Sequence, residues 1–269
     1  MTDMNVLYPF LLTLGAGLAT GIGSAIAFVS RRTSRRFFSF TLGLSAGVML
    51  YVSFVELFAQ SRELFAAAWG SRGGSMGVAL FFFIGMAFIG IIDKLVPSFE
   101  NPHEMRSIET MDAAHRRKES HLHHLGIMTA LAIAIHNFPE GIATFMAAES
   151  NPTVGIAIAV AIALHNIPEG IAVSVPVYYA TGSRKKAFLY SLLSGLAEPL
   201  GALLAFAILM PFINDVVLGA VLAAVAGIMV YISIDELLPA AREYGEPHIS
   251  IYGMVVGMMI MAASLIMLA

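Results

Sequence analysis

The sequence predicts an all-α integral membrane protein, with eight transmembrane helices in a 3+2+3 inverted-repeat arrangement and one transmembrane domain over residues 1–269. Three observations predict this fold. Hydrophobic residues make up 58% of the chain and charged residues only 12%, about half of the charged share of a soluble domain. Apolar runs of membrane-spanning length recur along the chain. Two sets of polar residues inside these runs are repeated. A chain with so few polar residues is expected to fold in lipid.

Eight apolar runs, bounded by charged or turn residues, mark the predicted spans. Each contains about 20 residues or more, the length that an α-helix needs to cross roughly 30 Å of hydrocarbon. Their approximate bounds are 6–30, 37–60, 76–96, 124–148, 153–179, 187–210, 215–240 and 249–268. Residues 1–5 carry no basic residue, so we expect the first run to be a retained span and not a cleaved signal peptide.

Lysine and arginine predict the orientation, because they are enriched in cytoplasmic links. All 15 basic residues except Arg62 and Arg72 lie at the links that follow the first, third, fifth and seventh spans. We therefore expect these links in the cytoplasm and both termini on the outer side of a bacterial inner membrane. The net charge of −3 argues against a nucleic-acid partner, and the absence of cysteine excludes disulfides and thiolate metal sites.

One repeat relates the second span to the seventh. Residues 47–57 read G-V-M-L-Y-V-S-F-V-E-L, and residues 227–237 read G-I-M-V-Y-I-S-I-D-E-L. These spans are five crossings apart and run in opposite directions. A pseudo-two-fold axis in the membrane plane would therefore relate spans 1–3 to spans 6–8, and span 4 to span 5. Inverted repeats are typical of transporters, although apolar helices also resemble one another by chance.

The second repeat is more specific. Residues 132–143 read A-I-A-I-H-N-F-P-E-G-I-A, and residues 161–172 read A-I-A-L-H-N-I-P-E-G-I-A, with ten of twelve positions identical. In each copy a histidine and a glutamate are four residues apart, as in His136 with Glu140 and His165 with Glu169, so they share one helix face. The prolines free a carbonyl oxygen and are expected to bend the helix.

Six acidic residues lie well inside the predicted spans: Glu56, Glu140, Glu169, Glu198, Asp235 and Glu236. A charged side chain at the bilayer centre costs about 2.5–3.5 kcal/mol, and no lysine or arginine lies in these spans at the same depth. The acids must be protonated, line a water-filled path, or face a cation. Histidine, asparagine, carboxylate and carbonyl groups together suit Zn²⁺, Fe²⁺, Mn²⁺ and Co²⁺. A structural His–Glu hydrogen bond between helices is the alternative.

Three further sets of residues are assigned from their positions. Asn137, Asn166 and Glu198, the acid before Pro199 in the sixth span, are predicted to form a second metal site beside the first. We interpret Glu56, Asp235 and Glu236 as pathway residues, with a structural role as the alternative. The link at about 97–123 is rich in histidine, and His121, His123 and His124 at its end are candidates for capturing released metal. A solvated loop also explains these histidines.

At these residues the chain resembles the ZIP family of divalent metal transporters, in particular its bacterial ZupT-like branch. The similarity consists of H-N-F-P-E-G in the fourth span, H-N-I-P-E-G in the fifth, the acid before Pro199, and the eight-span layout. The resemblance implies a binuclear centre with His136, Glu140, His165 and Glu169 at one site. Asn137, Asn166 and Glu198 would form the other, with the two repeat glutamates bridging. It also implies an elevator-like motion of spans 1, 4, 5 and 6 against spans 2, 3, 7 and 8.

We predict a secondary transporter that imports divalent transition metals, with no cofactor other than the metal it carries. No Walker A motif is present. Clustered carboxylates repel one another when no cation is bound, which makes metal–proton exchange a hypothesis. The alternative is an intramembrane metal-dependent hydrolase, against which the chain lacks H-E-x-x-H. A metal-sensing receptor is a third possibility, disfavoured because no signalling domain is visible. The sequence does not distinguish a monomer from a homodimer.

Overall fold

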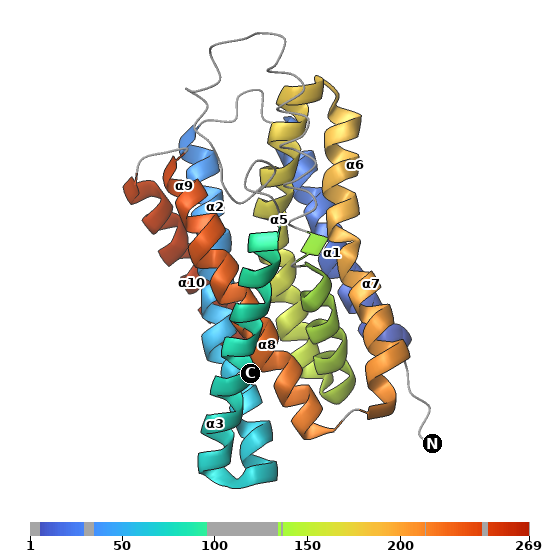
Figure 1. Cartoon of the computed structure of the whole chain (residues 1–269). Coiled ribbons are helices and arrows are strands. Elements are labelled where there is room, and N and C mark those ends of the chain that lie inside the picture. Colours follow the sequence, from blue (N-terminus) through green and yellow to red (C-terminus); the bar gives the residue numbers. More distant parts are fainter. Residues whose placement is uncertain are drawn as a thin grey trace.

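The computed structural model describes residues 6–29, 35–95, 134–135, 137–212, 214–243 and 247–268, and all regular structure among them is helical. Figure 1 shows an elongated bundle whose long helices follow its length. The α-helices are α1 Leu7–Val29, α2 Arg35–Val52, α3 Phe58–Leu95, α5 Pro152–Thr181, α6 Arg184–Gly195, α7 Ala197–Leu204, α8 Asp215–Ile232, α9 Leu238–Glu243 and α10 Pro247–Leu268. Residues 137–150 form a further helix between α3 and α5.

Six helical stretches of the described chain are long and apolar enough to cross a membrane. One of them, Ser39–Ile92, contains 54 residues and folds back at Gly70, which has φ 75° and ψ 170°. Glycine adopts a positive φ without steric cost. Beyond the turn, the ring of Phe81 stacks on Phe65 at 5.6 Å. We expected a link between residues 60 and 76, but the chain there is helical on both sides of Gly70.

The helix boundaries follow local capping chemistry. The side chain of Asn151 accepts hydrogen bonds from the first backbone amides of α5, and Pro152 occupies the first turn, where its missing N–H is not needed. Gly182 ends α5 in the left-handed conformation with φ 61°. Ser183 and Asn214 cap α6 and α8 in the same way as Asn151 caps α5. α5 therefore begins and ends within two residues of the predicted span and continues as one helix through Pro168.

Of three π-helical segments in the described chain, Ala205–Leu209 follows α7, and the other two lie at equivalent places of the second and seventh spans. Ser53–Leu57 separates α2 from α3, and Ser233–Leu237 separates α8 from α9. The two segments are 180 residues apart in the chain, the same offset that relates the repeated sequences 47–57 and 227–237. Single π-turns inside α-helices are uncommon and often occur at functional sites. The repeated residues therefore adopt the same unusual local geometry.

Glycines bring several helix backbones into direct contact. A methyl group added at Gly47 of α2 would overlap the carbonyl oxygen of Met254 of α10, and one added at Gly227 of α8 would overlap that of Phe82 of α3. Small residues at crossings let membrane helices approach closely. The same holds between α1, α5, α6, α7 and the helix at 137–150, at Gly17, Gly23, Gly141, Gly170, Gly195 and Gly201. Close backbone crossings therefore join α2, α3, α8 and α10 into one group. They join α1, α5, α6, α7 and the helix at 137–150 into another.

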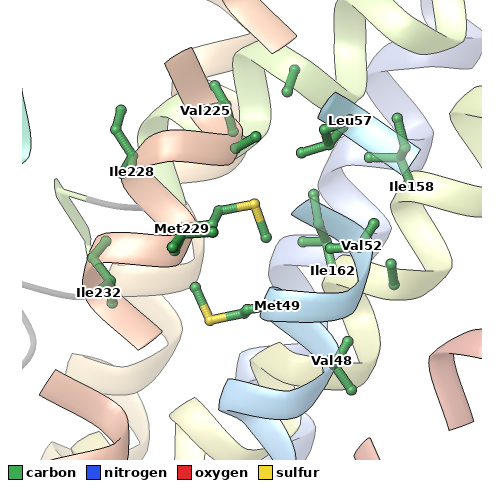
Figure 2. Packing of buried hydrophobic residues seen from close by; sticks show 14 of the residues in the cluster. Val48, Met49, Val52, Leu57, Ile158, Ile162, Val225, Ile228, Met229 and Ile232 are labelled. Atoms are coloured by element: carbon green, nitrogen blue, oxygen red, sulfur yellow. The ribbon is translucent and has the colours of Figure 1, made fainter. Parts of the chain in front are cut away.

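Side chains fill the space where the two groups meet. α2 packs against α5 as well as against α8, and the buried hydrophobic cluster extends across all three helices. Figure 2 shows Met49 of α2 and Met229 of α8 extending into the space between these helices, with Val52 and Ile162 at the side of α5. None of the glycines in the described part of the chain makes a backbone crossing between the groups. This boundary is therefore formed by apolar side chains.

Candidate metal centre

The central polar cluster lies where α5, α7 and the helix at 137–150 come together. Its six side chains are completely buried, with 0% of their surface exposed. They are Asn137, Glu140, His165, Asn166, Glu169 and Glu198. The structure thus brings together six of the seven predicted metal ligands, and the seventh, His136, lies outside the described residues. Burial of this many polar groups in one place requires that they hydrogen-bond to one another or bind a ligand.

Local backbone features position these side chains. Gly141 and Gly170 follow the two repeat glutamates, and each meets the backbone of a neighbouring helix, α7 for Gly141 and α1 for Gly170. Pro199 lacks an N–H and cannot bond to the carbonyl of Gly195, four residues earlier. The sixth span therefore divides at Leu196 into α6 and α7, and Glu198 lies in the first turn of α7.

A histidine from one repeat meets the glutamate of the other. The His165 Nε2 atom lies 3.2 Å from Glu140 Oε2, which joins α5 to the helix at 137–150. His165 and Glu169 are four residues apart and share one face of α5. The contact of His165 with Glu140 therefore brings this face against the helix at 137–150. An imidazole and a carboxylate in contact at a fully buried position form the donor set that a borderline divalent ion prefers.

The two asparagines have the same orientation. Asn137 Nδ2 donates to the backbone oxygen of Ser194 at 3.3 Å, and Asn166 Nδ2 donates to that of Ala16 at 2.9 Å. Asn166 Nδ2 also donates to Glu198 Oε1. Because each amide nitrogen is fixed on a carbonyl group, each amide oxygen points away from it. Asn166 thus presents its N–H group to Glu198, and the amide oxygens of both asparagines have no hydrogen-bond partner among the described residues.

Several buried oxygens in this cluster accept no hydrogen bond from the described residues. They are Asn137 Oδ1, Asn166 Oδ1, Glu140 Oε1 and Glu198 Oε2. Glu198 lies close enough to Glu140 and Glu169 for the charges of the three carboxylates to interact. No group of three or more histidine, aspartate or glutamate side chains with metal-site geometry occurs within the described residues, which do not include His136. A dication would supply the positive charge that this oxygen-rich cluster lacks.

Three serine hydroxyls outside the predicted site donate hydrogen bonds to backbone carbonyls around the cluster. Ser24 of α1 and Ser191 of α6 both donate to the carbonyl of Gly170, each at 3.2 Å. Ser45 of α2 donates to the carbonyl of His165 at 3.4 Å. These contacts fix α5 against helices on two sides. In the sequence they are isolated serines in apolar helices, and no motif distinguishes them from packing residues.

The predicted pathway residues are not among the fully buried side chains of the cluster. Glu56 is half-buried and lines a cavity of about 520 Å³ together with Gln60, Glu63 and Asn151. Asp235 is exposed, and Glu236 is partly buried in the π-helical segment after α8. The structure places Glu56 in a cavity, but that cavity is not lined by Asp235 or Glu236. His121, His123 and His124 lie outside the described residues.

Comparison with known proteins gives a consistent result. The family model described as ZIP zinc transporter matches residues 5–265. The chain is 59% identical over 266 residues to the zinc transporter ZupT of Oceanobacillus iheyensis, covering 98% of this chain and 99% of that protein. It is 62% identical over 268 residues to the zinc transporter ZupT of Chlorobium phaeovibrioides, covering 99% and 100%. The zinc transporter ZupT of Streptococcus mutans is 57% identical over 258 residues, covering 96% of each chain.

Proposed function

The chain belongs to the ZIP zinc transporter family, and on that premise we propose that it carries zinc into the cytoplasm through the buried cluster on α5, α7 and the helix at 137–150. It is a multi-pass membrane protein that imports divalent metal ions. Members of this family are transporters, so the alternative of an intramembrane hydrolase is set aside. Iron, manganese and cobalt are proposed as further cargo, because mixed nitrogen and oxygen ligands bind all of these ions.

The buried oxygens without hydrogen-bond donors carry the proposal. Each amide nitrogen is held by a backbone carbonyl, and Asn137 Oδ1 and Asn166 Oδ1, like one carboxylate oxygen each of Glu140 and Glu198, accept no hydrogen bond from the described residues. Oxygens without donors are poor structural partners for one another but good ligands for a cation. We assign Glu140, His165 and Glu169, with His136 from the sequence repeat, to one metal ion. The asparagines and Glu198 are assigned to a second ion, with the two repeat glutamates bridging.

We further propose eight transmembrane helices related by an inverted repeat. The glycine crossings support this arrangement, because they pair under constant sequence offsets. The crossing of Gly47 with Met254 corresponds to that of Gly227 with Phe82, and the crossing of Gly141 with Glu198 corresponds to that of Gly170 with Thr20. The two π-helical segments correspond in the same way. Inverted repeats are typical of transporters that bind substrate at the repeat interface, where the polar cluster lies.

The proposed transport motion is an elevator-like movement of spans 1, 4, 5 and 6 against spans 2, 3, 7 and 8. In the described structure this corresponds to the two groups joined by close glycine crossings. Apolar side chains between α2 and α5 can slide past one another more readily than interlocked backbones. We propose that both termini face outward. Glu56, in its cavity beside Asn151, is then proposed to lie on the entry side of the cluster, with Asp235 and Glu236 also serving the pathway.

Zinc uptake into liposomes containing the purified protein tests this proposal. The substitution Glu140→Gln keeps the side-chain shape and removes the negative charge, and Glu169→Gln does the same in the other repeat. We expect each variant to reduce the initial rate of ⁶⁵Zn uptake by at least about tenfold, which corresponds to roughly 1.4 kcal/mol. Glu149→Gln is the matched control, since Glu149 lies at the end of the same helix as Glu140. Uptake by Glu140→Gln equal to that of Glu149→Gln would exclude the assigned site.

A further inference from the structure

Two buried serines on different helices share the same pair of backbone carbonyls. Ser24 of α1 and Ser191 of α6 are both 0% exposed. The Oγ atom of Ser24 lies 3.4 Å from the carbonyl oxygen of Thr20 and 3.2 Å from that of Gly170. The Oγ atom of Ser191 lies 3.3 Å and 3.2 Å from the same two oxygens. A hydroxyl has one hydrogen, so each serine shares it between the two carbonyls and holds three helices at one point.

This point lies next to a candidate metal ligand. Gly170 directly follows Glu169 in α5, and the side chain of Glu169 is fully buried. A methyl group at Gly170 would overlap the carbonyl oxygen of Thr20, so the backbones of α1 and α5 already touch there. The shared hydroxyls therefore hold the backbone that carries Glu169 in one place relative to α1 and α6.

Hydrogen bonds continue from this point to the other repeat. Ser194 Oγ donates to the backbone oxygen of Ser191 at 2.8 Å, and Asn137 Nδ2 donates to the backbone oxygen of Ser194 at 3.3 Å. α6 thus links Gly170, beside the glutamate of one repeat, with Asn137 of the other. Metal ligands must be held within about 0.5 Å of their working geometry. A network of this kind sets the distance between ligands that come from different helices.

The other repeat forms an equivalent crossing without these serines. Gly141 meets the backbone of α7 as Gly170 meets that of α1, and the two carbonyls that these glycines meet are 178 residues apart. With the same offset, the two serines correspond to Ala202 and Thr13. Alanine has no hydroxyl, and the hydroxyl of Thr13 donates within its own helix. Close contact of the backbones therefore does not require the serines, which indicates a separate role for them.

We propose that Ser24 and Ser191 are positioning residues, which hold the backbone beside Glu169 so that its carboxylate reaches the transported cation. The inference rests on the proposed transport function. Neither hydroxyl has to touch the cation. Without the two hydroxyls, α5 can shift relative to α1 and α6, and the carboxylate is displaced although it is still present. A displaced ligand weakens the binding of the cation.

Uptake by serine variants in proteoliposomes tests this role. Ser24→Ala/Ser191→Ala removes both hydroxyls with little change of shape. Ser61→Ala is the matched control, because Ser61 of α3 is also fully buried and donates to the carbonyl of Gly219 on the neighbouring helix α8. We expect the double variant to raise the KM for ⁶⁵Zn roughly threefold to tenfold, the effect of losing a neutral hydrogen bond, and to leave the maximal rate within about twofold of wild type. Ser191→Ala alone is expected to raise the KM less, and Ser61→Ala to retain the wild-type KM.

A double-mutant cycle identifies the group through which the serines act. The Kd for zinc is measured by titrating the purified protein in detergent against a competing chelator. Loss of both serine hydroxyls is expected to raise this Kd roughly threefold to tenfold in the wild-type background. In a Glu169→Gln background the carboxylate charge is absent, and the same change is expected to raise the Kd less than about twofold.

Two results would overturn the proposal. The first is a KM of Ser24→Ala/Ser191→Ala equal to that of Ser61→Ala, because any buried serine would then serve as well. The second is the same increase of the Kd in both backgrounds, because the serines would then not act through Glu169. The Glu140→Gln variant separates this inference from the proposed function. If Glu140→Gln abolishes uptake while the double serine variant keeps the wild-type KM, only the positioning role fails.

Discussion

The imidazole of His165 joins the two repeats through a hydrogen bond. Its Nε2 atom lies 3.2 Å from Glu140 Oε2, and both side chains are fully buried. Removing one partner leaves a buried polar group without its hydrogen bond, at a cost of about 1–3 kcal/mol. His165→Leu is therefore expected to weaken zinc binding by at least about tenfold and to lower the Tm of the metal-free protein.

Zinc titration and thermal unfolding of the purified protein in detergent check this prediction. His248→Leu is the control, because His248 is an exposed histidine at the start of α10 that stacks on Tyr252. Unchanged zinc affinity in His165→Leu would remove His165 from the ligand set. A lower Tm alone would then assign the imidazole a structural role.

The repeated motif predicted the main members of the buried polar cluster but not their surroundings. Histidine, asparagine and glutamate at matching positions of two apolar runs are too polar for lipid, so their convergence was predictable, and the structure buries Asn137, Glu140, His165 and Asn166 together. The serine contacts were not predictable, because one hydroxyl in an apolar helix usually bonds to its own backbone. Ser45 donates to the carbonyl of His165, which is 120 residues away, and only the folded structure brings these residues together.

Helix length was predictable from hydropathy, but local helix geometry was not. The apolar run 153–179 agrees with α5 at Pro152–Thr181. The run 215–240 gave no sign of the π-helical segment Ser233–Leu237, since a single π-turn is too short to change the hydropathy pattern of the run. A link between residues 60 and 76 was predicted, but not that the chain there stays helical on both sides of Gly70, where a single positive φ reverses it.

Helix crossings make specific glycines indispensable. A methyl group at Gly227 would overlap the backbone oxygen of Phe82, and backbone cannot move aside as a side chain can. Gly227→Ala is expected to separate α8 from α3 and destabilise the protein by about 1–3 kcal/mol, the usual cost of overpacking. Gly15→Ala is the control, because a methyl group at Gly15 meets nothing within 4 Å. Thermal unfolding of both variants checks the prediction, and an equal Tm would show that α8 is not tightly packed there.

At the scale of the whole molecule, the long helices of the described residues form two groups that differ in how they are held together. Within each group, glycines place backbone against backbone, as at Gly170 in one and Gly47 in the other. Between the groups, α2 meets α5 through buried side chains of one apolar cluster. The cluster of metal-binding candidates lies within the group of α1, α5, α6, α7 and the helix at 137–150. One hydrogen bond links it to the other group, from Ser45 of α2 to the carbonyl of His165. The proposed movement of the cluster against α2 requires a division of this kind.

Cross-linking tests whether transport requires that movement. The chain has no cysteine, so introduced pairs react without background. Val52 and Ile162 lie on α2 and α5 in the same buried cluster, whereas Met49 and Met229 both belong to the group of α2 and α8 (Figure 2). A short thiol-specific cross-linker acting on a Val52→Cys/Ile162→Cys variant is expected to stop ⁶⁵Zn uptake, and cleavage of the link is expected to restore it. The same treatment of Met49→Cys/Met229→Cys should leave uptake unchanged, because that link lies within one group. Undiminished transport with the first pair fully linked would show that zinc crosses without displacement of α5 along α2.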